Sequence, residues 1–146
     1  MLKGISKIIS PELLKVLCEM GHGDEIVIAD ANFPSEAYGK RVIRADGIKG
    51  TDMLSSVLSL IPLDTYASPN MILMELTESD KGKIKPVIWE EYEKIANDKD
   101  KNLRLGRMDR FSFYERAKQA YAVIATGEEA VYANIILKKG VISLDG

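Results

Sequence analysis

The chain has 146 residues, and 20 lysines and arginines against 22 aspartates and glutamates give it a formal net charge of −2. A hydrophobic fraction of 46% beside 29% charged residues is typical of a globular domain and argues against the disordered, collagen-like and coiled-coil classes. The balanced charge also argues against a general nucleic-acid or membrane-surface binder, because both need a basic field. We expect residues 1–146 to form a single domain.

The cysteine count and the apolar runs indicate the compartment. Cys18 is the only cysteine, so an intrachain disulfide cannot form. The longest unbroken apolar run covers residues 120–125, far short of the roughly 20 residues that a membrane span needs. No secretory hydrophobic segment follows the N-terminal lysines. These features predict a soluble, cytoplasmic protein.

Helical and strand patterns alternate along the chain. Apolar residues at helical spacing predict helices over residues 10–21, 51–61, 86–95 and from 112 onward. Short apolar runs predict strands at 26–29, 42–43, 71–76, 121–125 and 135–137. Residues 31–39 and 97–102 are expected to be loops. Ser10, Thr51 and Ser112 are the candidate helix caps, the last in a capping box with Glu115.

This alternation favours an α/β fold: a single compact domain whose mixed or mostly parallel sheet carries helices on both faces. In such folds, ligands bind beyond the carboxyl ends of the strands. Asp30 directly follows the first predicted strand, and a turn follows Ala125. We therefore expect the functional site at that edge of the sheet.

Several chemistries lack their motifs. The sequence has neither a P-loop nor a dinucleotide-binding glycine pattern, and one histidine with one cysteine does not make a zinc site. No paired aspartate motif points to magnesium. A nucleophilic pair of Cys18 and His22 is formally possible, but Cys18 lies in an apolar helical pattern, where we expect it to act as a small hydrophobic residue.

The single histidine remains as a candidate acid/base group. His22 lies between Gly21 and Gly23, which let the backbone turn and leave the imidazole accessible. Histidine is the side chain whose ordinary pKa, about 6.5, suits proton transfer near neutral pH. Taken alone, however, a histidine in such a turn is more often a cap or a surface residue.

Five segments together carry a more specific pattern, in order over nearly the whole chain. They are Gly21–Glu25, Asp30 with Phe33–Pro34, Arg44–Gly47, Arg110–Phe111 with Phe113–Ala117, and Thr126–Glu128 with Tyr132–Ile135. These segments resemble the sugar mutarotase family of fucose mutarotases and ribose pyranases. The first segment and the Phe113–Ala117 block look like the L-fucose branch, whereas Tyr132–Asn134 is shared with the ribose branch.

The resemblance implies an isomerase that interconverts the α and β anomers of L-fucose without a cofactor or a metal. Acid/base catalysis opens the ring to an aldehyde, which recloses on its other face. A positioned side chain accelerates proton transfer by roughly 10²–10⁴-fold, which suits a reaction already measurable in water. D-ribose pyranase activity and a non-catalytic monosaccharide-binding protein remain the alternatives.

The resemblance also implies roles for individual residues. His22 matches the catalytic histidine, and Asp30 matches a substrate-binding carboxylate that is also a candidate to orient His22. The other substrate-binding matches are Arg110, Tyr132, Ala133 and Asn134. Ala133 stands where some fucose-type members have glycine, and we expect backbone contacts to survive this difference.

For some other side chains, a structural role is expected more than a role in the site. Three aromatic residues offer a sugar an apolar platform but are more often core residues at such spacings: Phe33, Trp89 and Phe111. Glu115 and Arg116 are expected on a helix surface. The resemblance further implies a homo-oligomeric ring, with each monosaccharide site completed by a neighbouring subunit, and no nucleic-acid or membrane partner.

Overall fold

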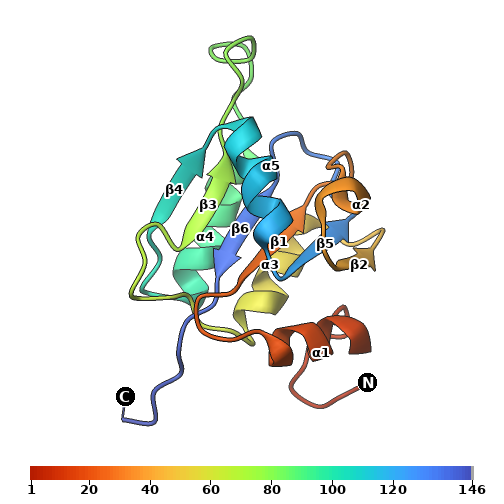
Figure 1. Cartoon of the computed structure of the whole chain (residues 1–146), viewed down its shortest axis with the longest axis vertical. Coiled ribbons are helices and arrows are strands. Elements are labelled where there is room, and N and C mark those ends of the chain that lie inside the picture. The colour runs from red at the N-terminus through yellow and green to blue at the C-terminus, as the bar shows by residue number, and fades with distance from the viewer. Residues whose placement is uncertain (146) are drawn as a thin grey trace.

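The computed structural model describes residues 1–145 as a six-stranded mixed sheet covered by helices on both faces (Figure 1). The strands are β1 (Glu25–Ala29), β2 (Val42–Ala45), β3 (Met71–Met74), β4 (Leu105–Met108), β5 (Ala122–Thr126) and β6 (Ile135–Lys138). The helices are α1 (Pro11–Glu19), α2 (Ser35–Tyr38), α3 (Gly50–Leu58), α4 (Ile88–Lys99) and α5 (Arg110–Gln119). The predicted α/β fold is confirmed.

The sheet has the strand order β2-β5-β1-β6-β3-β4. Strands β2, β5 and β1 run parallel, as do β3 and β4, whereas β6 runs antiparallel to both β1 and β3. In the centre, Ile28 of β1 faces Ile124 of β5 on one side and Ile135 of β6 on the other. Strand β1 is therefore an inner strand with hydrogen-bonded neighbours along both edges.

The alternation of side chains along β1 joins the two halves of the core. Ile26 and Ile28 belong to the cluster that contains the buried residues of α1, α3 and α4. Val27 and Ala29 belong to the cluster formed with Phe113 and other apolar residues of α5. Burial on both faces explains the unbroken apolar run of this strand. The same packing holds both ends of β1 in fixed positions.

The ends of several elements differ from the predicted ones. Helix α3 begins after Lys49, which makes no side-chain cap, and Thr51 lies inside the helix. Helix α5 is capped by Asp109, whose carboxylate accepts a hydrogen bond from the Ser112 amide at 2.9 Å. The capping-box assignment to Ser112 was wrong by three residues because Asp109 offers the same acceptor at the correct position.

Two predicted loops contain regular structure. The short helix α2 lies within residues 31–39, and α4 continues to Lys99 through part of the stretch predicted as a loop. Strand β4, which the sequence did not reveal, forms one edge of the sheet, and none of its residues is fully buried. With Gly106 and Arg107 in its middle, β4 lacks the apolar run that identifies an inner strand.

The prediction for Cys18 was also wrong. Its side chain is exposed, because it lies on the outer side of α1, whereas Leu13, Val16 and Leu17 are the buried residues of that helix. No helix within residues 1–145 is long and apolar enough to cross a membrane.

Helices α3 and α4 meet where Gly50 packs against Tyr92. The hydroxyl of Tyr92 lies against the α carbon of Gly50 and donates a hydrogen bond to the Ala133 carbonyl at 3.0 Å. In Gly50→Ala the new methyl group would overlap that hydroxyl and displace a buried donor. We expect a loss of about 2–4 kcal/mol in the free energy of unfolding, measured by urea denaturation.

Gly21→Ala is the matched control, since a Cβ at that position meets only an ordinary contact with Asp24 at 3.7 Å. Equal stabilities of the two variants would contradict the packing described for Gly50.

Candidate functional site

A polar pocket lies beyond the carboxyl end of β1. Its volume is about 240 Å³, which is below the range of roughly 300–1,000 Å³ that is usual for drug-sized ligands. Its lining includes Asp30, Asn32, Phe33, Arg110, Tyr132 and Asn134. Four residues predicted to bind substrate thus meet in one small pocket, and the backbone of a fifth, Ala133, touches Asp30.

Asp30 is buried at the base of this pocket. The carboxylate accepts hydrogen bonds from the amides of Asn32, at 3.0 Å, and Ala133, at 3.4 Å. The Asp30 amide donates to the side-chain oxygen of Asn134 at 2.8 Å. Burial raises the pKa of Asp30 despite these hydrogen bonds. Asp30 and Asn134 therefore fix each other, although 104 residues separate them along the chain.

Tyr132 lies on the other side of the pocket with a left-handed backbone, at φ 58°. Such a conformation is uncommon for a residue other than glycine and recurs at binding and active sites. Its carbonyl accepts a hydrogen bond from the indole of Trp89 at 2.8 Å. Its hydroxyl donates to Asp80 and receives a hydrogen bond from the Thr77 amide at 3.3 Å. Tyr132 is thus held at its backbone by α4 and at its hydroxyl by the long loop after β3.

Arg110 is the first residue of α5, and its side chain lines the pocket. Its Nε atom donates to the Tyr114 hydroxyl at 2.9 Å, and Tyr114 packs edge-to-face on Phe33 with ring centroids 5.5 Å apart. Of the three candidate aromatic platforms, Phe33 lines the pocket. Within the described chain, Phe111 and Trp89 do not line it. Phe111 is exposed, and the Trp89 indole donates its hydrogen bond to the Tyr132 carbonyl.

His22 lies at the opposite end of β1. The turn before that strand is closed by a hydrogen bond from the Gly23 amide to the Lys139 carbonyl at 2.8 Å, and Gly23 has φ 87°, a value that favours glycine. The Nε2 atom of His22 is 3.0 Å from Oδ1 of Asp64. The imidazole is 45% exposed, whereas the Asp64 side chain is 4% exposed.

Within one chain, Asp30 is therefore too far from His22 to orient it. His22 precedes β1 and Asp30 follows it, and the five residues of that strand alone span roughly 17 Å at about 3.3 Å per residue. Within residues 1–145, His22 does not line the pocket. The carboxylate that contacts the imidazole belongs to Asp64 instead.

Arg116 likewise lies away from the pocket. Its guanidinium forms two hydrogen bonds with the Glu25 carboxylate, at 2.6 and 2.8 Å, and so ties α5 to the start of β1. Among the described residues, no three His, Cys, Asp or Glu side chains are grouped closely enough to hold a metal ion.

The sequence did not predict several residues of the pocket and of the surroundings of His22. Asn32 and Thr77 line the pocket, and Asp64 contacts the histidine. Asn32 follows Asp30 by two positions, a spacing typical of aspartate turns, so local chemistry could have found it. Asp64 lies 42 residues from His22, and no local pattern indicates such a contact.

Comparisons with known proteins identify the family. Residues 3–142 match the RbsD/FucU transport protein family. The chain belongs to this family. It is 52% identical over 147 residues to the fucose mutarotase of Mus musculus, covering 98% of this chain and 96% of that protein.

Two solved structures of the RbsD/FucU family extend the comparison. The fucose mutarotase of Streptococcus pneumoniae, solved in complex with L-fucose, has a TM-score of 0.91 and 47% identity over 97% of this chain and 100% of that one. RbsD of Bacillus subtilis, solved with D-ribose, has a TM-score of 0.72 and 26% identity over 98% of this chain and 100% of that one. The chain is thus more similar to the former.

The two buried aspartates should titrate on opposite sides of the ordinary aspartate pKa. Burial raises the pKa of Asp30. For Asp64, burial acts in the same direction, but hydrogen bonds from the Tyr66 amide and His22 outweigh it and lower the pKa. NMR titration of the carboxyl carbons should place the Asp30 midpoint above the ordinary value and the Asp64 midpoint below it.

Each shift contributes to stability with its own sign. The stabilisation from Asp64 is present above its unfolded-state pKa and is lost as the pH falls through the lower folded-state value. The contribution from Asp30 is favourable at low pH and is lost as the pH rises from the unfolded-state pKa through the higher folded-state value. Midpoints in the reverse order would contradict the described environments.

Proposed function

We propose that this RbsD/FucU protein is an L-fucose mutarotase, which interconverts the α and β anomers of the free sugar. The observation that carries the proposal is the small pocket in which Asp30, Arg110, Tyr132 and Asn134 converge. The similarity to the Streptococcus pneumoniae protein solved with L-fucose supports the choice of sugar. Carboxylate, guanidinium, phenol and amide groups together supply the donors and acceptors that several sugar hydroxyls need.

The reaction needs proton transfer at two oxygens of the sugar. The anomeric hydroxyl loses its proton, the ring oxygen gains one, and the C1–O5 bond breaks to give an open-chain aldehyde. After rotation about the C1–C2 bond, the ring oxygen attacks the other face of the aldehyde, and the two protons return. A neutral imidazole can accept one proton and deliver it again, so His22 is our candidate for the acid/base group.

The residues of the pocket would bind and orient the sugar. Asp30 accepts hydroxyl hydrogen bonds, and its fixed position beside the Ala133 amide defines where the ring lies. Arg110 and the Asn134 side chain offer further contacts at the rim. Tyr132, whose hydroxyl is held by Asp80 and Thr77, connects the pocket to the loop after β3.

Because His22 and the pocket lie at opposite ends of β1, we propose that a second copy of the chain supplies the imidazole to each pocket. A closed ring of subunits allows every copy to give its His22 to one neighbour and to receive one from another. Such a site also explains why a catalytic histidine is half-exposed in the single chain.

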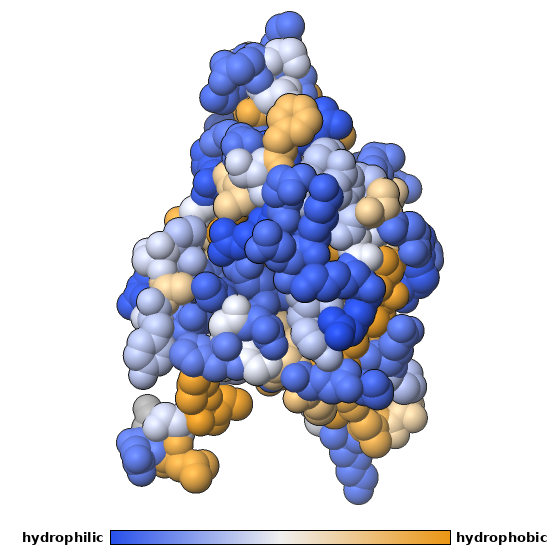
Figure 2. All heavy atoms as spheres, in the orientation of Figure 1, coloured by the Kyte–Doolittle hydropathy of each residue, from blue (hydrophilic) through white to orange (hydrophobic). Residues whose placement is uncertain are grey.

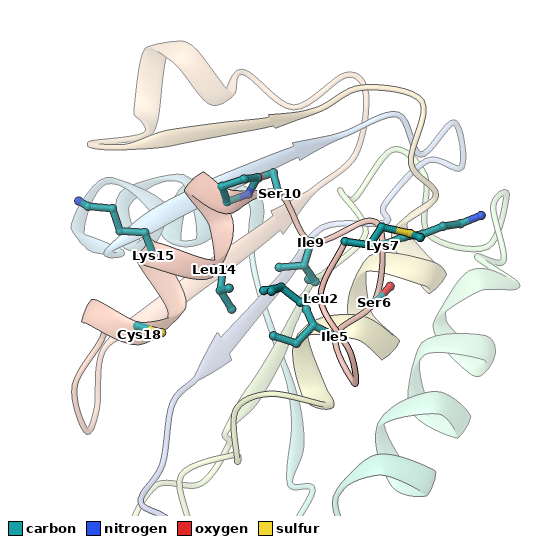
Figure 3. Close-up of a pocket in the computed structure, with 11 residues that line it drawn as sticks. Leu2, Ile5, Ser6, Lys7, Ile9, Ser10, Leu14, Lys15 and Cys18 are labelled. Atoms are coloured by element: carbon teal, nitrogen blue, oxygen red, sulfur yellow. The ribbon is translucent and has the colours of Figure 1, made fainter.

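The surface of the chain supports self-association. Figure 2 shows separate apolar areas at the lower end of the molecule, where Figure 1 places both termini. The exposed large apolar residues of the terminal segments are Leu2, Val141, Ile142 and Leu144. Nearby, the N-terminal segment and α1 enclose an apolar cavity of about 610 Å³, with Leu2, Ile5, Ile9 and Leu14 in its wall (Figure 3). Exposed apolar surface of this kind is typical of contacts between subunits. We also propose a cytoplasmic location, because Cys18 is a free cysteine and free thiols are typical of reducing compartments.

Saturation-transfer NMR tests the activity without a coupled enzyme. The protein should accelerate exchange between the two anomeric proton signals of L-fucose at equilibrium. His22→Ala should lose that acceleration while retaining sugar binding, because it removes a proton carrier worth roughly 10²–10⁴-fold. Lys94→Ala, a change at an exposed position of α4, is the control and should behave as the wild type.

The same measurement separates the alternatives. Acceleration confined to D-ribose would assign the protein to the pyranase reaction. Binding of L-fucose without acceleration of its exchange would make it a monosaccharide-binding protein.

A further inference from the structure

Tyr66 is a large side chain beside His22 that has no role in the function proposed above. We propose that Tyr66 enters the pocket of a neighbouring copy together with His22 and packs against the C6 methyl group of L-fucose, so that it selects for 6-deoxy sugars. The shared site and the choice of sugar rest on the proposed function, whereas the contact itself is measured without turnover.

The rings of His22 and Tyr66 share one support. The Tyr66 amide donates a hydrogen bond to Oδ1 of Asp64 at 3.0 Å, and the same oxygen is 3.0 Å from Nε2 of His22. The ring centroids of His22 and Tyr66 are 5.3 Å apart, with an interplanar angle of 55°. Because Asp64 is buried, it sets the position of the two rings relative to each other. A neighbouring copy that receives the imidazole therefore meets the phenol ring as well.

The exposure of Tyr66 also indicates a contact outside its own chain. Tyr66 is 83% exposed, and it is the one exposed tyrosine among the six of the sequence, all of which lie in the described chain. A tyrosine ring has a large apolar surface, and tyrosines are enriched at interfaces for this reason. An uncovered ring next to an acid/base candidate is thus available to a bound sugar and to the copy that holds it.

The position of the imidazole determines which part of the sugar Tyr66 meets. To exchange a proton with the anomeric or the ring oxygen, an imidazole nitrogen must come within about 3 Å of O1 or O5. A ring whose centroid is 5.3 Å from that of the imidazole then lies near the two carbons bonded to O5, which are C1 and C5. C1 carries a hydroxyl group, whereas C5 of L-fucose carries the methyl group.

Of these two neighbours, the methyl group is the one that suits an aromatic ring. Covering a methyl group removes apolar surface from water, which is favourable. Covering a hydroxyl group with a ring face would leave it without a hydrogen-bond partner, which is costly. The phenol ring therefore belongs on the C5 side of the sugar.

The pocket offers a second apolar surface for the same methyl group. Asp30 lies at the base of the pocket and Asn134 beside it, so these polar groups take hydroxyls of the sugar and the C1–O5–C5 edge faces the mouth. Val131 lines the pocket and is 50% exposed, so part of its apolar surface is uncovered in a single chain. The methyl group would then lie between Val131 and the partner's Tyr66.

Saturation-transfer difference NMR reads this contact directly. In protein deuterated except at its tyrosines, saturation of the tyrosine ring protons should reach the methyl protons of bound L-fucose more strongly than its other carbon-bound protons. Tyr66→Phe with deuterated phenylalanine keeps the ring but removes its hydrogens, so the methyl signal should fall to a small remainder while L-fucose still binds. A methyl signal as strong in Tyr66→Phe as in the wild type would come from other tyrosines and would overturn the proposal.

D-arabinose measures what the contact contributes, because its pyranose ring equals that of L-fucose without C6. NMR titration should show that the wild type binds L-fucose about three- to tenfold more tightly than D-arabinose, the order expected for covering one methyl group. Tyr66→Ala should lose most of this preference by weakening the binding of L-fucose alone. Equal weakening for both sugars would mean that Tyr66 supports the assembly and not the methyl group, and the proposal would fail.

Val87→Ala is the matched control, because it truncates another exposed apolar residue and should keep the preference for L-fucose. The outcomes also separate this inference from the proposed function. Binding of L-fucose against Tyr66 without accelerated anomer exchange would refute the mutarotase activity and support the contact. Accelerated exchange without saturation transfer from Tyr66 would refute the contact alone, and no binding of L-fucose would overturn both.

Discussion

Strand β1 is the constraint on which the rest of the structure depends. Its buried residues alternate between the two halves of the core, and neighbouring strands pair with both of its edges. The strand therefore cannot shift or bend enough to bring its ends together. His22 is fixed before it and Asp30 after it, so a single chain presents its imidazole and its polar pocket at opposite ends of β1. Assembly of several copies is the direct way to bring the two together.

The two ends of the strand use buried carboxylates differently. Asp30 lies under the pocket, where burial dominates and raises its pKa. Asp64 lies under the histidine, where hydrogen bonds and the imidazole dominate and lower its pKa. The carboxylate that we propose to bind sugar hydroxyl groups and the one that pairs with an imidazole thus have different surroundings within one small fold. Both are fixed by backbone amides, which requires little reorganisation when substrate binds.

The sequence predicts the inner strands and most of the site, and the reasons differ. Burial on both faces gives β1, β3, β5 and β6 apolar runs that can be recognised locally. Asp30, Arg110, Tyr132, Ala133 and Asn134 came from the family resemblance, since they come together only across long stretches of chain. Strand β4 was missed because Gly106 and Arg107 interrupt its apolar residues, so it carries no such run. Asp64 was missed because its contact with His22 is purely tertiary, and for the same reason the sequence does not show that β1 separates Asp30 from His22 within one chain.

The central claim, that each site combines His22 of one copy with the pocket of another, is tested most directly by complementation. His22→Ala and Asp30→Asn chains with different affinity tags are expressed together, and oligomers carrying both tags are isolated. Each variant alone should be inactive toward L-fucose, whereas mixed oligomers should regain part of the activity, because some sites combine an intact histidine with an intact pocket. Mixed oligomers as inactive as either parent would contradict the shared site.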